Sequence, residues 1–496
     1  MSSTFSGYRI AASGMNTTQA GLTAMSHNLA NMNTVGYSRQ QSVSEELVTL
    51  QSGGTSLGSG ASVAEISRAR DVLLDKTYRQ QNAALSYWDA KNTNITSMQQ
   101  ILDDMSSSTD ATDDSGETGI QAMVTDFFNS WEELAKDPTS QSARQTVTED
   151  ATTLVSSLSQ VDQQLEQMQE DCTASVKDGV DQLNDYAQQV KKLNIQIRAA
   201  EAGGTEANDL RDQRDEIVDE MSSLADVSAN EQNGVYTVSI GGVSLVSGDS
   251  THTLVATGTG TVTNPLQVTW KELGSAVNLS GGSIKGQLED ADQSGVQAID
   301  TTTSYDYDPT AITSSIAALR QGLNDLITTV AAQVNTLHSS GTDLDGDTGT
   351  AFFTTIDSNQ PLSISNIEVN PELVNDPDKV AAAASSDSGD NTIASDIYDL
   401  QTAKDFTSQG LAVTVSGFYP AVVSWLSTTG ENADSTYTTQ EDLVSQVNTQ
   451  RQSISSVSMD EEMSNMVALQ NAYGANSKVL STLDNMLAFL IDHVNS

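Results

Sequence analysis

Basic residues are scarce in this chain of 496 residues. It has 22 lysines and arginines against 66 aspartates and glutamates, which gives a formal net charge of −44. Such a field repels nucleic-acid phosphates and anionic membrane surfaces, so binding to nucleic acid is excluded as a main function. We expect the acidity either to keep a secreted or assembling protein soluble, or to reflect a salty habitat in which counterions screen it.

Cysteine and long apolar runs are also lacking. The single cysteine, Cys172, can form neither an intrachain disulfide nor a multi-cysteine metal site, and its place in a helical apolar pattern predicts a small buried side chain. No run of about 18 apolar residues occurs, so we expect no membrane insertion. The N-terminus has no basic segment followed by an apolar one, so we expect export, if any, without a cleaved signal peptide.

Helix-breaking residues are missing from long stretches. Between Ser140 and Ala200 there is no proline and only Gly179, while apolar residues recur at helical spacing. This pattern predicts one helix roughly 90 Å long at about 1.5 Å per residue, a length typical of a scaffold. Further helices are predicted at about 74–105, 120–134, 208–221 and 312–337. From Tyr236 to about Gly286, β-branched residues alternate with glycine turns, which predicts a compact β insertion.

Both ends of the chain carry a coiled-coil-like pattern. The N-terminal stripe is Phe5, Tyr8, Ala12, Met15, Gln19, Leu22, Ser26 and Leu29. The C-terminal stripe is Met459, Met463, Met466, Tyr473, Asn476, Leu480, Leu483, Leu487, Leu490 and Val494. Each helix is too polar to be stable alone, so we expect the two to pair with each other and to pack against neighbouring subunits.

The predicted fold class is therefore mainly α with a β-rich inserted domain. It has terminal coiled-coil helices, a long helical rod domain and nested, discontinuous domains. We expect a terminal coiled-coil assembly domain at 1–40 plus 458–496, a helical rod domain at 60–225 plus 306–457, and a β-rich inserted domain at 226–305.

Motifs for catalysis or metal binding are weak. The segment "GTSLG" (54–58) matches a serine-nucleophile pattern but lies among glycines and serines at 51–62, which predicts a flexible loop. "DLDGDTG" (343–349) resembles the start of a calcium loop, but its glycine is misplaced and Thr354 stands where a bidentate carboxylate is needed, so a turn is predicted. The four histidines are scattered. We expect no enzymatic activity and no catalytic, cofactor-binding or metal-binding residues.

Several segments resemble flagellar axial proteins. "SGMNTTQAGLTAMSHNLANMNTVGYSRQ" (13–40) is similar to the N-terminal signature shared by rod, hook and hook-associated proteins. Four further segments, together with "SMDEEMSNMVALQNAYGANSKVLSTLDNML" (458–487), resemble the FlgK family of hook-associated proteins at the hook-filament junction. These four are "GASVAEISRARDVLLDKTYRQQNAALSYW" (60–88), "NDLRDQRDEIV" (208–218), "VNTLHSSGTDLDGDTGTAFF" (334–353) and "PDKVAAAASSDSGDNTIA" (377–394). The chain departs from the family at Gly474, within the last helix, and at Ser456-Val457-Ser458, which suggests a softer seam near Tyr473.

This resemblance implies an extracellular structural protein of the bacterial flagellum that self-assembles through its terminal helices. The implied partners are further copies in a ring, the hook protein, a second junction protein next to the filament, and a flagellar export chaperone at the C-terminal helix. We expect the assembly interface to include Leu22, Leu29, Asn31, Thr34, Gly36, Tyr37, Met463, Met466, Tyr473, Asn476, Leu480, Leu483, Leu487 and Leu490.

Two other functions remain open at the level of sequence. One is a hook or distal-rod subunit, against which the long helix at 140–200 and the segment "NDLRDQRDEIV" argue. The other is an axial scaffold that carries an enzymatic or adhesive β domain.

Overall fold

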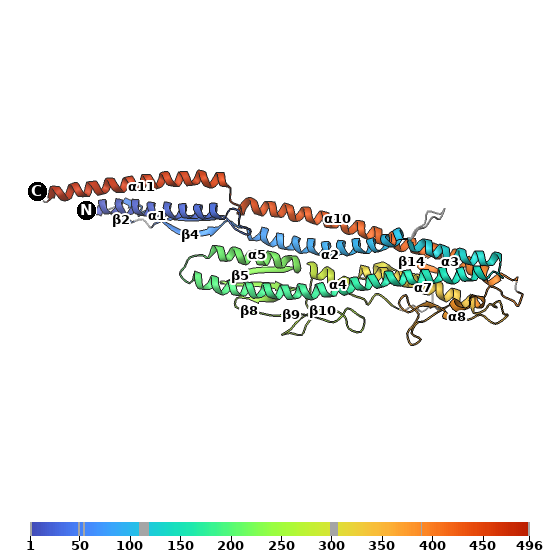
Figure 1. Cartoon of the computed structure of the whole chain (residues 1–496). Coiled ribbons are helices and arrows are strands. Elements are labelled where there is room, and N and C mark those ends of the chain that lie inside the picture. The colour runs from blue at the N-terminus through green and yellow to red at the C-terminus, as the bar shows by residue number, and fades with distance from the viewer. Residues whose placement is uncertain are drawn as a thin grey trace.

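The protein is a long, narrow molecule with both termini at one end (Figure 1). The computed structural model describes residues 2–47, 50–52, 55–108, 119–297, 306–387 and 389–494. Within these ranges, none of the helices combines the length and the hydropathy that a membrane span needs.

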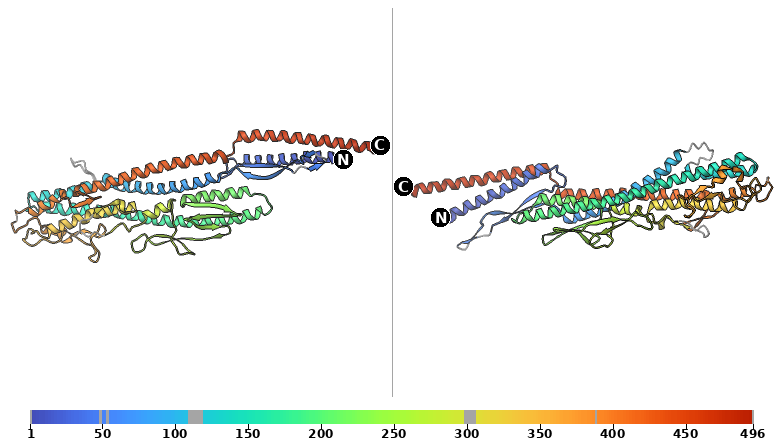
Figure 2. Two further views of the ribbon diagram at one scale, coloured as in Figure 1. Left: turned by 180° about the vertical axis from the view of Figure 1, so that it is seen from behind. Right: turned by 60° about the horizontal axis from the view of Figure 1, so that its bottom comes forward.

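The terminal helices lie side by side beyond the end of the rod. They are α1 (Ser2–Asn31) and α11 (Met459–Val494), and they run antiparallel, so that both chain ends point away from the rod (Figures 1 and 2). The pairing of the two terminal helices that the sequence predicts is therefore observed within one chain.

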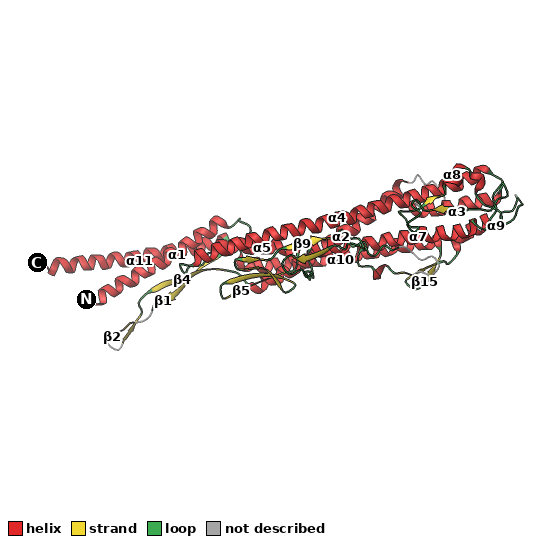
Figure 3. Ribbon diagram, turned by 90° about the horizontal axis from the view of Figure 1, so that it is seen from below, coloured by secondary structure: helices red, strands yellow, loops and turns green. Residues whose placement is uncertain are grey.

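A β hairpin, which the sequence did not indicate, follows α1. Strands β1 (Gln40–Glu46) and β4 (Ala61–Arg68) pair antiparallel, and α1 packs against both. At the tip, β2 (Leu50–Ser52) pairs with β3 (Thr55–Leu57) (Figure 3). The prediction of a flexible loop at 51–62 is wrong for these strands, whereas Gly53 and Gly54 lie outside the described residues. Ser56 lies in a strand that leads to another strand, which differs from the strand-to-helix turn of a serine nucleophile.

Long helices form the rod, as predicted. They are α2 (Val72–Ser108), α3 (Gly119–Lys136), α4 (Gln141–Glu201), α5 (Asn208–Leu224), α7 (Ser315–His338) and α10 (Val415–Ser455). The longest, α4, has 61 residues and starts where the Ser140 side chain accepts a hydrogen bond from the Ala143 N–H at 3.2 Å. Its apolar stripe is buried along the whole helix, and Cys172 is buried as predicted, with 3% of its surface exposed.

The β insertion lies against the C-terminal half of α4. A four-stranded antiparallel sheet consists of β5 (Val227–Gln232), β6 (Val235–Ile240), β7 (Val243–Ser247) and β8 (Ser250–Thr251). A second ladder pairs β9 (Leu254–Thr257) with β10 (Gln267–Trp270), and α6 (Ser283–Asp290) returns the chain to the rod. The sequence pattern placed the first strand at Tyr236, but the sheet begins earlier, with β5. This strand was missed because its segment "SANEQ" is polar and has little strand character.

The far end of the rod consists of short elements. These are β11 (Asp306–Tyr307), η1 (Pro309–Ala311), β12 (Phe353–Thr354), β13 (Glu368–Val369), α8 (Pro371–Asn375), η2 (Pro377–Lys379), α9 (Thr392–Asp399), η3 (Leu400–Thr402), β14 (Phe406–Ser408) and β15 (Leu411–Val413). An aromatic cluster holds this end together, with Phe127 and Trp131 of α3 packed on Phe352.

The segment 343–349 forms the turn that was expected there. The Asp343 carboxylate accepts hydrogen bonds from the N–H groups of Asp345 and Asp347, and Gly346 has a φ of 89°. Among the described residues, no group of three or more His, Cys, Asp or Glu side chains is arranged to hold a metal ion.

The predicted fold class is confirmed, since the chain is mainly helical with a β-containing insertion. The division into three nested domains with the boundaries given above stays a prediction.

Candidate assembly site and joint

The two terminal helices approach each other along a line of small residues. An added Cβ on Gly7, Gly14 or Gly21 of α1 would lie 3.6, 3.0 or 2.9 Å from a side-chain atom of Leu483, Asn476 or Leu469 of α11, respectively. One further heptad along, Asn28 donates a hydrogen bond to Glu462 at 3.1 Å. The facing positions therefore step by seven residues on both helices, which is the coiled-coil repeat.

This seam on α1 lies one residue before the predicted stripe. The predicted residues Leu22 and Leu29 are half-buried, whereas the neighbouring Gly21 and Asn28 are buried and meet α11. Glycine lets the two backbones come close, so the smallest residues and not the most apolar ones face the partner.

On α11 most of the predicted residues follow the seam. The half-buried positions among them are Met466, Tyr473, Asn476, Leu480, Leu483 and Leu487. Met463 lies to one side and is 50% exposed. Leu490 lies on α11 at the next heptad position, but its side chain is outside the described part of the structure.

A cluster of polar side chains around Asn28 binds the end of α1 to the segment that follows it. Asn28 is 1% exposed; its amide also donates to the carbonyl of Gln40 at 2.9 Å, and its oxygen accepts from the Tyr37 hydroxyl at 2.7 Å and from the Gln40 N–H at 2.9 Å. The Tyr37 hydroxyl also lies 3.1 Å from Nδ1 of His27. Burial, followed by the carboxylates of Asp209, Asp212 and Glu462, raises the pKa of Tyr37 above its ordinary value, so this hydroxyl stays protonated.

The predicted residues 31 to 36 shape the turn that follows. Asn31 donates from its side chain to the carbonyl of His27 at 3.1 Å, and its own carbonyl accepts from the N–H of Thr34 at 2.9 Å. Gly36 has a φ of 76°, and a Cβ there would meet the Glu216 carboxylate at 2.9 Å, so this position requires glycine. The structure thus brings Asn31, Thr34, Gly36 and Tyr37 together beside α5.

Helix α5 is the part of the rod to which this terminal region is attached. Asp212 accepts hydrogen bonds from both the N–H and the hydroxyl of Ser38, at 2.9 and 2.8 Å. Asn208 donates to the carbonyl of Ile66 at 2.6 Å, and Asp209 accepts from Gln40 at 2.8 Å. Residues 208, 212, 215 and 219 share one face of α5 because each is three or four positions from the next.

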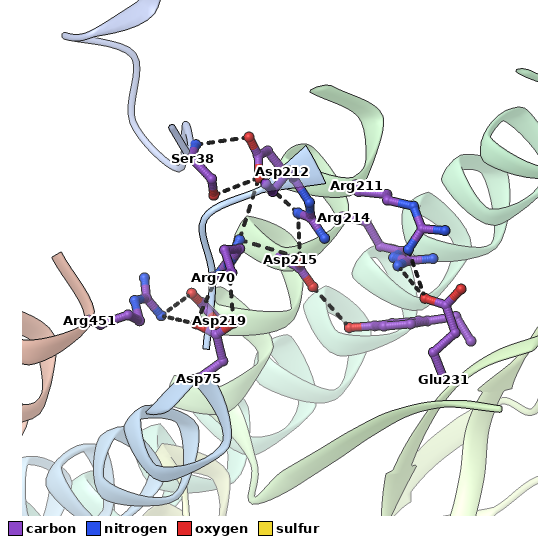
Figure 4. Close-up of polar contacts among 12 residues, drawn as sticks. Ser38, Arg70, Asp75, Arg211, Asp212, Arg214, Asp215, Asp219, Glu231 and Arg451 are labelled. Carbon is purple, nitrogen blue, oxygen red and sulfur yellow. Dashed lines mark hydrogen bonds and ion pairs between the residues drawn. The ribbon is translucent and has the colours of Figure 1, made fainter. Parts of the chain in front are cut away.

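A buried set of alternating charges extends these contacts across four segments of the chain (Figure 4). Arg68, at the end of β4, pairs with Asp212 and Asp215, both at 2.8 Å. Asp219 accepts from Arg79 of α2 and from Arg451 of α10, both at 2.6 Å.

Arg70 completes the set. Its guanidinium binds the Asp75 carboxylate with two hydrogen bonds of 3.0 Å and lies 3.3 Å from Asp215. We call these eight residues the joint cluster: Arg68, Arg70, Asp75, Arg79, Asp212, Asp215, Asp219 and Arg451.

The arginines also determine the ionisation of the central carboxylate. Burial raises the pKa of Asp215, but the guanidinium groups of Arg70, Arg68, Arg79 and Arg214 outweigh it and lower this pKa to about 2. Asp215 is therefore charged above about pH 4, and the joint cluster is a set of ion pairs.

Sequence reasoning found only part of this site. It singled out "NDLRDQRDEIV" as a family-like segment but gave no role to Asp212, Asp215 or Asp219. It also missed the role of Asn28, which in the sequence looks like an ordinary polar residue of a helix. The signal that could have found Asn28 is its place in the heptad of Gly7, Gly14 and Gly21.

Comparisons with known proteins agree with the resemblance. The family model for the helical domain of the flagellar hook-associated protein FlgK matches residues 105–353. Models for the C-terminal part of flagellar basal body rod FlgEFG proteins and for flagella basal body rod proteins match residues 448–492 and 9–37.

Relatives match over nearly the whole chain. The flagellar hook-associated protein 1 of Bacillus subtilis is 28% identical over 99% of both chains, and that of Escherichia coli is 26% identical over 97% of this chain and 98% of its own length. The solved flagellar hook junction protein FlgK of Burkholderia pseudomallei shares the fold, with a TM-score of 0.60 and 17% identity over 77% of this chain and 100% of its own. The chain therefore belongs to the FlgK family of flagellar hook-associated proteins, and it is a structural component of the bacterial flagellum at the junction of hook and filament.

Proposed function

We propose that this protein assembles into a ring of subunits through its paired terminal helices. The observation that carries this proposal is the set of large apolar side chains on α11 that α1 leaves in solvent. These are Met459, Met463, Val467, Val479, Met486 and Ile491, each between 50% and 61% exposed. On α1, Tyr8 and Ile10 are 37% and 40% exposed.

Apolar side chains on both flanks of a two-helix seam favour further helices beside it. Copies of this chain repel each other through their charge, so contacts between them need surfaces that gain from burial. The residues of α11 that the sequence predicts for the interface then have two roles. Those on the seam pair α1 with α11, and Met463 contacts a neighbouring copy.

The proposed partners are the hook protein on one side of the ring and a second junction protein on the filament side. Before assembly, an export chaperone covers 458–496, and the chain leaves the cell without a cleaved signal peptide. The proposed role is structural, with no catalytic activity. Support for these partners comes from the family to which the chain belongs and from the exposed apolar side chains of α11.

The test is complementation of a strain that lacks its junction protein. Replacing Met463 and Val467 by glutamine removes apolar surface beside the seam without touching the facing positions, and we expect loss of motile filaments. Gln470→Ala, at an exposed position of the same helix, is the matched control and should restore motility. Normal filaments with the double variant would refute assembly through this face.

A second experiment labels the exported protein and determines where on the flagellum it lies. Signal at only the junction supports the proposal, whereas signal along the whole appendage would point to a hook or rod subunit or to a decorating scaffold. Truncations lacking 1–40 or 458–496 should fail in both assays, because each removes one helix of the pair.

A further inference from the structure

Packing alone does not fix the angle between the terminal helices and the rod. A cleft of about 690 Å³ lies between α1, β4 and the turn that joins α4 to α5, and residues of all three line it. The adjoining Gly203 and Gly204 have no other atoms within 4 Å of an added Cβ. The terminal region could therefore swing into this space unless other contacts hold it.

The joint cluster is built to resist such a swing. It contains four arginines and four aspartates, so its charges balance, and all eight side chains are at most 18% exposed. Displacing one segment would leave an aspartate or an arginine buried without its counter-charge, which is strongly unfavourable. The arrangement therefore has one favoured position and few intermediate ones.

Arg451 is the contribution of the C-terminal half of the chain. In addition to its ion pair with Asp219, Arg451 lies 3.6 Å from the Asp75 carboxylate. Its guanidinium group stacks on the ring of Tyr78, 4.2 Å from the ring centre. A few residues later α10 ends, the carbonyl of Ser455 accepts from the N–H of Arg39 at 2.8 Å, and α11 begins at Met459. The contacts of Arg451 therefore hold the last turns of α10 against α2 and α5, directly before the chain leaves the rod for α11.

We infer that the joint cluster is an electrostatic lock that fixes the direction of the terminal helix pair relative to the rod, with Arg451 as the residue that couples the C-terminal helix to it. Arg451 is thus a positioning residue for assembly. This property belongs to the single chain and goes beyond the proposed ring, so it is measured without assembly.

The experiment measures distances between two spin labels on the full-length monomer. Cysteines replace Gln19 on α1 and Gln189 on α4, both exposed, while Cys172 is buried and stays unlabelled. The test variants are Arg451→Gln and the double variant Asp212→Asn with Asp215→Asn. Arg198→Gln is the matched control, because the Arg198–Asp249 pair is 55% and 60% exposed and lies outside the lock.

We expect a single narrow distance distribution for the parent and for Arg198→Gln. In Arg451→Gln the distribution should become at least twice as wide, with an unchanged helical circular dichroism signal. Arg451→Lys keeps the charge but loses the stacking on Tyr78 and the ion pair with Asp75. The width of its distance distribution should therefore lie between those of the parent and Arg451→Gln. A loss of helical signal in the double aspartate variant would mean that this variant is unfolded, and the test then depends on Arg451→Gln and Arg451→Lys. Parent-like widths in both Arg451 variants would overturn the inference.

Discussion

At the scale of single residues, burial raises the pKa of two aspartates of this chain, but only one of them has arginines that outweigh this effect. Asp215 lies among arginines and has its pKa lowered to about 2, so the free energy that its ion pairs contribute is present above pH 4 and is lost as the pH falls toward 2. Asp325 of α7 is 2% exposed, and its Oδ2 has no hydrogen-bond partner. Burial raises the pKa of Asp325 to about 8, although the hydrogen bond from Gln321 acts against this shift.

We predict that Asp325→Asn makes the protein more stable at pH 8 than the parent. A folded-state pKa above that of the unfolded chain means that the parent loses stability as the pH rises from about 4 to about 8, at up to about 1.4 kcal/mol per pH unit. Asparagine cannot ionise and removes this loss. Calorimetric unfolding at several pH values measures the difference, and Asp181→Asn, at an exposed position of α4, is the control. An unchanged pH profile in Asp325→Asn would contradict the prediction.

At the scale of elements, the glycines of the terminal helices differ in what surrounds them. A Cβ on Gly21 would lie 2.9 Å from Cδ1 of Leu469, whereas a Cβ on Gly474, inside α11, would meet nothing within 4 Å. The first glycine is needed for the close approach of two helices. The second has no such role, and it weakens its helix because glycine gains more backbone freedom on unfolding.

We predict opposite effects for the two substitutions. Gly21→Val should weaken the helix pair by about 1–3 kcal/mol through crowding, although valine favours helix more than glycine does. Gly474→Ala should strengthen α11 by up to about 1 kcal/mol. Amide hydrogen exchange over residues 466–480 checks both, with faster exchange expected for the first and slower for the second. Slower exchange in Gly21→Val would show that the helices do not approach as described.

The sequence predicted the elements with strong periodicity and missed those that depend on distant partners. The helices at 72–108, 141–201 and 315–338 were indicated because their apolar stripes repeat many times. The β1–β4 hairpin was missed because it is short, rich in serine and glutamate, and stabilised by α1. The joint cluster could not be predicted, since Arg68, Asp215 and Arg451 are brought together only by the fold.

At the scale of the whole molecule, the arginines, which make up half of the 22 basic residues, are concentrated at one place. Of the eleven arginines, seven lie around α5, namely Arg39, Arg68, Arg70, Arg79, Arg211, Arg214 and Arg451. The rest of the surface therefore carries most of the uncompensated charge. Self-repulsion of this kind destabilises a compact state and opposes contact between copies.

We predict that salt stabilises this protein and promotes its association. Raising sodium chloride from about 0.1 to 1 M shortens the Debye length from about 10 to 3 Å, which screens the exposed acids far more than the buried joint cluster. The unfolding temperature and the sedimentation coefficient should both rise, whereas sucrose at equal osmolality should leave the sedimentation coefficient unchanged. Equal behaviour at low and high salt would also remove the salty-habitat explanation of the charge.

The heptad register of α1 and α11 makes the lengths of the two chain ends interdependent. Gly7 faces Leu483, Gly14 faces Asn476, and Asn28 faces Glu462 at the end nearest the rod. An insertion of one or two residues in either helix would turn every later seam position away from its partner, whereas the gain or loss of seven residues in both helices would keep all remaining pairs matched. Sequences that descend from this chain can therefore change the reach of the helix pair only in steps of about 10.5 Å, at 1.5 Å per residue, and only when both termini change together.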